Sequence, residues 1–122
     1  MILLDTNVLI EILKNNSKTI RKVASFVPPL KISSITAMEL IIGARNKQEV
    51  KKLDKFIGSF QVVHIQPAIS ITALKLITQY AKSHALDIPD ALIGATAIQI
   101  KAKLFTYNAK DFRFLPSIEI TS

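Results

Sequence analysis

The stretch of sequence that decides the fold runs Asp87-Ile-Pro-Asp-Ala-Leu-Ile-Gly-Ala-Thr-Ala-Ile-Gln-Ile-Lys-Ala-Lys-Leu-Phe-Thr-Tyr-Asn-Ala-Lys-Asp-Phe112. It predicts a helix followed by a short buried strand at residues 104–106. Pro89 suits the first helical position, where the N–H that proline lacks would have no partner. Asp90 then falls in the first turn, where the helix dipole favours a carboxylate. The stretch therefore places an acidic side chain at the start of a helix that leads directly into a strand.

Small side chains line one face of this predicted helix. Gly94, Ala95 and Ala97 allow the helix to lie close to a β-sheet. Lys101 and Lys103 are expected to complement the negative end of the dipole at the C-terminus of the helix. We therefore expect this helix to pack directly on a sheet.

The rest of the chain alternates in the same way. Apolar runs predict strands at residues 2–4, 31–35, 61–65 and 117–120, and helices at residues 8–15, 17–26, 36–45, 48–60 and 68–84. This order predicts a mostly parallel sheet of about five strands with helices on both faces, of the Rossmann-like α/β class. No linker, composition break or internal repeat divides residues 1–122, which we expect to form a single domain.

The composition excludes several kinds of site. The chain has no Cys, which rules out disulfide scaffolds, thiolate metal sites and cysteine nucleophiles. His64 and His84 are isolated, so a histidine-based zinc site is not expected. No apolar run approaches the roughly 18 residues of a membrane helix, and Met1 to Asp5 is typical of a strand rather than of a signal peptide. We therefore expect a cytoplasmic protein with no membrane partner.

The charge of the chain favours a polyanionic partner. The net charge is +7, with the basic residues scattered along the sequence. Four of the nine acidic residues, in contrast, fall at strand ends or at the starts of helices. A negative pocket on a strongly basic body suits an enzyme that holds cations and binds phosphates.

The four acids are expected to meet at one edge of the sheet. Asp5 and Asp111 each follow a strand, whereas Glu39 and Asp90 lie near the starts of helices. Asp87, one helical turn before Asp90, competes with it for a role there. In open α/β sheets ligands bind at the carboxyl ends of the strands. Carboxylates crowded there would raise one another's pKa unless a cation neutralised them, and all-oxygen ligands select Mg²⁺ or Mn²⁺.

Each acid also has a purely structural alternative. Asp5 could be a helix N-cap. Thr36-x-x-Glu39 has the spacing of a capping box, in which Glu39 would satisfy the backbone N–H of Thr36. Asp90 could simply complement the helix dipole, and Asp111 could be a solvated turn residue. One acid alone is weak evidence of function, and the shared position of all four is stronger evidence.

Four segments resemble the motifs of one family. They are Asp5-Thr6-Asn7-Val8, Thr36-Ala37-Met38-Glu39-Leu40 with Gly43, Asp90-Ala91-Leu92-Ile93-Gly94-Ala95-Thr96-Ala97, and Thr106-x-Asn108-x-x-Asp111-Phe112. In this order and spacing the chain resembles PIN-domain nucleases, in particular the VapC toxins of prokaryotic toxin–antitoxin pairs. The resemblance spans nearly the whole chain. Two positions depart from it, because Gly94 stands where the family usually has Ala and Tyr107 is bulkier than expected beside the site.

The resemblance implies a PIN-like fold and a metal-dependent ribonuclease. It also implies a homodimer, with a contact expected on the helix at 68–84, and a protein antitoxin that covers the active site. It places the following residues in the site: Asp5, Glu39, Asp90 and Asp111 as catalytic metal ligands, and Thr6, Thr106 and Asn108 as their polar support.

The favoured hypothesis is hydrolysis of RNA phosphodiester bonds by water that Mg²⁺ or Mn²⁺ activates. Surface lysines, Arg45 and Lys110 would attract the RNA backbone without reading its sequence. The alternative is a catalytically silent module of the same fold that binds nucleic acid or a protein, although a silent module need not keep all four acids. Phosphoryl transfer of the receiver or dehalogenase type is disfavoured, because Asp5-Thr6-Asn7 lacks the second acid that each requires.

Overall fold

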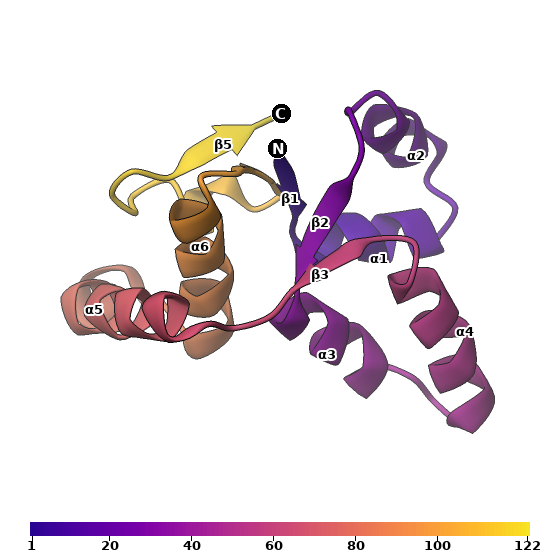
Figure 1. Cartoon of the computed structure of the whole chain (residues 1–122), viewed down its shortest axis with the longest axis horizontal. Helices are drawn as coiled ribbons and strands as arrows, with labels where there is room; N and C mark the ends of the chain where they lie inside the picture. Colours follow the sequence, from indigo (N-terminus) through magenta and orange to yellow (C-terminus); the bar gives the residue numbers. More distant parts are fainter.

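The computed structural model describes all residues 1–122, which form one five-stranded sheet with helices on both faces (Figure 1). The strands are β1 (Ile2–Leu4), β2 (Leu30–Ser33), β3 (Gln61–Val63), β4 (Lys103–Phe105) and β5 (Glu119–Thr121). The helices are α1 (Thr6–Leu13), α2 (Ser17–Ala24), α3 (Ser34–Ile42), α4 (Lys47–Ile57), α5 (Pro67–His84) and α6 (Ile88–Ile100), with a short 3-10 helix η1 (Ala109–Asp111). The strand order is β3-β2-β1-β4-β5, and every neighbouring pair is parallel. The predicted α/β architecture is confirmed, with a sheet that is parallel throughout.

β1 is the centre of the sheet and is buried on both faces. Ile2 and Leu4 belong to one hydrophobic cluster and Leu3 to the other, since successive side chains of a strand point to opposite sides. Burial on both faces explains why this strand is a continuous apolar run. The pairing with β4 extends past the strands, because the N–H of Asp5 donates to the carbonyl oxygen of Phe105 at 3.0 Å. The residues that follow β1 and β4 therefore begin side by side.

The helices form two layers. α5 and α6 lie on the face of the sheet to which Leu3 belongs, and α1 to α4 lie on the other (Figure 1). Val8, Leu9 and Leu40 pack with Leu4 in the second layer. None of the helices has the combination of length and apolar character that crossing a bilayer requires.

The start of α3 differs from the sequence prediction. The helix begins at Ser34, two residues earlier than expected, because Ser33 is its N-cap and accepts a hydrogen bond from the N–H of Ile35 at 3.0 Å. Thr36 consequently lies inside the first turn and is fully buried. The predicted capping box between Thr36 and Glu39 is therefore wrong, and Glu39 is left free of that structural role.

The start of α6 also differs, by one residue. Asp87 is the N-cap, and its Oδ1 accepts a hydrogen bond from the N–H of Asp90 at 2.9 Å. Ile88 is the first helical residue and Pro89 the second, where the absence of an N–H is equally harmless. Asp90 lies in the first turn, as expected.

The C-terminus of α6 is closed by backbone conformation. Lys101 adopts a left-handed conformation with φ of 57°, and its N–H caps carbonyl groups of the last turn. Lys103 lies beyond this cap as the first residue of β4, so the expectation that it complements the helix end is wrong. The turn between helix and strand is short, which keeps α6 close to β4.

Gly94 lies where α6 approaches the segment before β5 most closely. A Cβ atom on Gly94 would lie 2.6 Å from Leu115 Cδ1 and 3.7 Å from Phe112 Cδ1. Phe112 and Leu115 are both buried, so the Leu115 side chain would have to shift within the core to admit a new methyl group. Ala95 and Ala97 are buried in the cluster that includes Leu3, in agreement with the predicted small-residue face.

We expect Gly94→Ala to lower the free energy of unfolding by about 1 kcal/mol. Overpacking of a well-packed core costs about 1–3 kcal/mol, which exceeds the roughly 1 kcal/mol of helix propensity that Ala gains over Gly. Urea denaturation of the wild type, Gly94→Ala, Leu115→Val and the double variant would measure it. The double variant should be more stable than the sum of the single changes predicts, because Leu115→Val makes room for the new methyl group. Strict additivity would contradict the contact.

Candidate active site

The acidic residues singled out in the sequence lie around the carboxyl edge of the sheet. Asp5 directly follows β1, and Glu39 lies in α3, which follows β2. Asp90 lies in the first turn of α6, and Asp111 ends η1, which follows β4. Mutual electrostatic effects link Asp5 and Asp90 to Glu39 and Asp111, so the four carboxylates face a common region.

Asp5 serves two partners with its two oxygens. Its Oδ1 accepts a hydrogen bond from the N–H of Thr6 at 2.8 Å and caps α1. Its Oδ2 accepts one from the hydroxyl of Thr106 at 2.7 Å. The N-cap alternative for Asp5 is thus correct for Oδ1. The other oxygen, Oδ2, is bound by Thr106, which directly follows β4. The carboxylate is 5% exposed, so its orientation is fixed.

The hydroxyl of Thr106 connects Asp5 to two neighbouring residues through hydrogen bonds. A threonine hydroxyl has one hydrogen to donate and can accept two. The Thr106 hydroxyl donates to Asp5 and accepts from the backbone N–H of Asn108 at 3.0 Å and from Asn7 Nδ2 at 3.4 Å. Thr106 therefore contacts Asp5 directly, whereas Asn108 is linked to it only through its backbone N–H on Thr106.

Glu39 is oriented by Thr6 across the space between α1 and α3. The hydroxyl of Thr6 lies 2.8 Å from Glu39 Oε1 and 2.9 Å from Thr36 Oγ1. With a single hydrogen, the Thr6 hydroxyl can donate to Glu39 while it accepts from Thr36. Glu39 is exposed and Thr36 is buried, so the threonine pair anchors the base of a carboxylate that points outward.

Burial and neighbouring negative charges raise the pKa of two of the carboxyl groups, Asp90 and Asp5. Burial, then the negative charges of Asp87, Asp5, Asp111 and Glu39, raise the pKa of Asp90 to about 7. Burial is also the main cause that raises the pKa of Asp5, with a smaller contribution from neighbouring carboxylates, although its hydrogen bonds from Thr106 and Thr6 oppose the shift. Asp87, whose place in the site the sequence left open, caps α6 and adds negative charge next to Asp90.

The oxygen atoms of the four carboxylates are suitable ligands for a hard divalent cation, but they are not arranged in advance as a complete coordination site. All four candidate ligands are carboxylates, and a cation among them would relieve the repulsion that raises the pKa of Asp90. No three acidic or histidine side chains converge closely enough to form a ready-made ligand set. An ion at this edge would therefore be held partly through water, as Mg²⁺ commonly is.

The two basic residues predicted to contact nucleic acid, Arg45 and Lys110, differ in their surroundings. Arg45 Nε donates to Glu49 Oε2 at 2.8 Å in an exposed ion pair, and Glu49 lines a hollow of about 280 Å³ together with Glu39. Lys110 is exposed in η1, next to Asp111. Both thus border the acidic edge, and Arg45 is already engaged by an acid.

Two residues of the site have structural roles that sequence reasoning did not assign. Asn7 donates to Thr106 with its amide nitrogen and accepts from the N–H of Tyr107 at 3.2 Å with its oxygen. Thr36 supports Thr6, as described above. Both residues lie inside the motifs described above, so the sequence indicated that these positions matter. It did not indicate which residues they contact.

Comparison with known proteins identifies the family. Residues 2–115 match the PIN domain. The chain therefore belongs to the PIN-domain family. Ribonuclease VapC1 of Methanocaldococcus jannaschii is 34% identical over 115 residues, which cover 93% of this chain and 80% of that relative. Ribonuclease VapC19 of Mycobacterium tuberculosis is 27% identical over 123 residues, which cover 98% of each chain.

Solved structures show the same fold. A DNA-bound VapBC from Salmonella typhimurium superposes with a TM-score of 0.84 at 27% identity, covering 98% of this chain and 96% of that one. A toxin–antitoxin complex from Klebsiella pneumoniae superposes with a TM-score of 0.83 at 29% identity, covering 97% and 95%. The similarity thus extends over the full sheet and all of its helices.

The raised pKa of Asp90 predicts that metal-free stability falls as the pH rises. In the folded chain this carboxyl keeps its proton up to about pH 7, whereas in the unfolded chain it loses it near 3.8. The folded state therefore binds more protons between these values, and the free energy of unfolding decreases across that window. Asp5 contributes in the same direction. Asp90→Asn should shrink the difference in stability between about pH 5 and pH 8 by about 1–2 kcal/mol, a figure reduced for partial solvent screening.

Urea denaturation in EDTA at the two pH values would measure this effect. Asp54→Asn is the matched control, because Asp54 is an exposed acid on α4. An unchanged pH dependence in Asp90→Asn would show that Asp90 ionises normally in the folded chain.

Proposed function

We propose that this protein is a ribonuclease that hydrolyses RNA phosphodiester bonds with Mg²⁺ or Mn²⁺. The observation that carries the proposal is the presence of four carboxylates around the carboxyl edge of a PIN-domain sheet, where burial and the neighbouring acids raise the pKa of Asp90 to about 7. The relatives described above are named ribonucleases. A fold built for packing alone gains nothing from carboxylates that repel one another.

Asp5, Glu39 and Asp90 would hold one cation directly or through water, and Asp111 would complete its shell or help to bind a second ion. When bound, the ion lowers the pKa of coordinated water and stabilises negative charge on the phosphate oxygens. Because Asp90 holds a proton near neutral pH in the metal-free chain, binding of the cation would release that proton.

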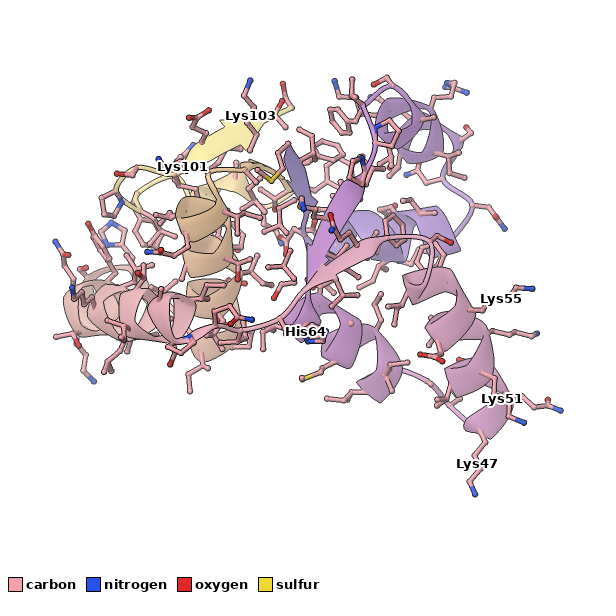
Figure 2. The ribbon with its side chains drawn as sticks, viewed as in Figure 1. Lys47, Lys51, Lys55, His64, Lys101 and Lys103 are labelled. Carbon is pink, nitrogen blue, oxygen red and sulfur yellow. The ribbon has the colours of Figure 1, made fainter.

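The other residues of the site would orient these ligands. Thr106 fixes the carboxylate plane of Asp5, and Thr6 fixes one oxygen of Glu39. Lys110 and the surface lysines would draw the RNA backbone to the edge, with Arg45 contributing once its pair with Glu49 opens. Figure 2 shows Lys47, Lys51 and Lys55 along the outer side of α4, pointing away from the sheet, so this row would act at long range rather than at the site.

We further propose that the protein is the toxin of a VapBC-type pair, which forms a homodimer and binds a protein antitoxin. Large apolar side chains are exposed on two separate helices: Ile42 is 81% exposed on α3, and Leu74 is 68% exposed on α5. Ile42 lines an apolar hollow together with Met38 and Ile41, and Leu74 lines another together with Ile88 and Leu92. Contiguous apolar surface of this kind marks sites of protein association. The solved relatives are described as toxin–antitoxin and VapBC complexes.

A catalytically silent binding module of the same fold is the alternative. It would need the basic surface and the apolar patches but none of the carboxylates. The hydrogen bonds that hold the buried Asp5 carboxylate and the exposed Glu39 carboxylate at the sheet edge favour the enzyme.

Asp5→Asn and Asp90→Asn should each reduce Mg²⁺-dependent RNA cleavage by roughly 100-fold or more, the usual effect of losing one electrostatic group at a reacting centre. The metal-free stability of Asp90→Asn should be unchanged or higher, since the change relieves repulsion. Asp5→Asn should be less stable by about 1 kcal/mol, because the Asn amide nitrogen cannot accept one of the two hydrogen bonds that Thr6 and Thr106 donate to Asp5. Degradation of a labelled RNA and thermal melts in EDTA would measure both properties. Full activity in either variant would remove that residue from the mechanism.

Glu39→Gln tests the ligand role of Glu39 separately. Gln keeps the size of the side chain and can still accept from Thr6, so stability should barely change. Cleavage and Mn²⁺ affinity, measured by calorimetry, should both fall. Glu119→Gln is the matched control, because Glu119 is an exposed glutamate on β5 and lies outside the acidic edge. Equal Mn²⁺ affinity and equal cleavage in Glu39→Gln would leave a site of three carboxylates.

A further inference from the structure

Tyr107 stands between two hollows next to the acidic edge. The first, of about 400 Å³, is called here the polar hollow; the side chains that define it are Asn7, Glu11, Asn16 and Asn108, with Tyr107. The second, of about 370 Å³, is called the basic hollow; Lys18 and Lys22 define it with Tyr107. Lys18 and Thr19 also border the polar hollow, so the two spaces share Tyr107 and Lys18 as their common wall.

The ring of Tyr107 is held firmly although it is exposed. Its hydroxyl lies 2.7 Å from the hydroxyl of Thr19, which is buried. Its backbone N–H donates to Asn7 Oδ1, and Phe105 packs against the ring edge-on with 5.3 Å between centroids. The side chain nevertheless remains 48% exposed. A rigid aromatic ring with an accessible surface loses little entropy when it binds a flat ligand.

The polar hollow is joined directly to the acidic edge. Asn7, which holds the backbone of Tyr107, also donates to Thr106, and Thr106 donates to Asp5. A ligand in the polar hollow would therefore be linked to the Asp5 carboxylate through two residues, Asn7 and Thr106.

The chemistry of the two hollows differs in a way that matches a nucleotide. Glu11 in the polar hollow repels phosphate but can accept hydrogen bonds from the amino group of a base. The side-chain amide of Asn108 offers both a donor and an acceptor there. Lys18 and Lys22 in the basic hollow attract phosphate instead. Single-stranded RNA is commonly recognised by bases that stack on aromatic side chains while cations follow the backbone.

We propose that Tyr107 is the stacking platform of a nucleotide-binding subsite, which takes one base of single-stranded RNA in the polar hollow and an adjoining phosphate at Lys18 and Lys22. The identity of the strand rests on the proposed ribonuclease function. The subsite would set where the strand lies relative to Asp5, and hence which bond reaches the acidic edge.

Tyrosine emission tests the stacking directly, because the chain has no Trp and its only other tyrosine is Tyr80. Tyr80 packs against His84 and Phe114, away from both hollows. Tyr80→Phe and Tyr107→Phe each leave one reporter. Hexacytidylate added in EDTA, with free tyrosinamide as the inner-filter reference, should quench the emission of Tyr80→Phe and leave that of Tyr107→Phe unchanged. Equal quenching in the two variants would overturn the proposal.

Affinity for labelled hexacytidylate, measured by anisotropy in EDTA, gives a second test. Tyr107→Ala should bind roughly 5- to 150-fold more weakly, the range for loss of one base–aromatic stack, while Tyr107→Phe should keep most of the affinity. Tyr107→Leu retains apolar volume without an aromatic face and should behave like Tyr107→Ala, which covers the case that the alanine variant fails to fold. Wild-type affinity in a folded Tyr107→Leu would contradict the stacking role.

The phosphate contact has its own control. Lys18→Gln with Lys22→Gln should lower the slope of log affinity against log salt by about 0.7, the contribution of the one phosphate that the two lysines share. Lys51→Gln with Lys55→Gln removes the same charge from the outer side of α4 (Figure 2) and should change the slope much less. Equal changes would mean that only the overall charge matters.

These results separate the subsite from the proposed function. Metal-dependent RNA cleavage by the wild type without quenching of Tyr107 would refute the subsite and leave the ribonuclease standing. Quenching of Tyr107 without any cleavage would support the subsite and favour the silent binding module.

Discussion

The pairing of β1 with β4 is the contact on which the acidic edge depends. It brings together two segments that are about a hundred residues apart in sequence, and it ends with the hydrogen bond from Thr106 to Asp5. Because β1 is buried on both faces, it cannot shift its register without moving apolar side chains out of two clusters at once. The position of the Asp5 carboxylate is therefore set by the hydrophobic core, and Thr106 only fixes its final orientation.

The same edge concentrates negative charge, whereas the rest of the chain carries a net positive charge. The chain as a whole is strongly basic, yet Asp90 is surrounded by other carboxylates and titrates near neutral pH. Such an arrangement costs stability in the absence of a cation, and the extensive parallel core must offset this cost. Thr6, Thr106 and Asn7 satisfy the polar groups of the edge, so the remaining cost comes from the burial of Asp90 and Asp5 and then from repulsion among the carboxylates.

The sequence was sufficient for the architecture because its signals are local and repeated. Continuous apolar runs predict buried parallel strands, and acids directly after them must reach the carboxyl edge. The start of α3 could not be read in this way. Ser33 and Thr36 are both good N-caps, and the choice between them depends on β2 ending at Ser33, which pairs with Val63 of β3. The partners of Glu39 and Tyr107 were equally hidden, because Thr6 and Thr19 are 33 and 88 residues away.

The strand order also determines when this edge can exist during synthesis. β1 is made about a hundred residues before its neighbour β4 and the residues up to Asp111. A chain still emerging from the ribosome therefore carries Asp5 and Glu39 without the partners that complete the edge. Non-local pairing of this kind is slow to form and cannot precede the arrival of the second strand. The acidic edge is thus assembled only after β4 and η1 have left the ribosome, and the nascent chain is without it while all the elements from α1 to α6 are being made.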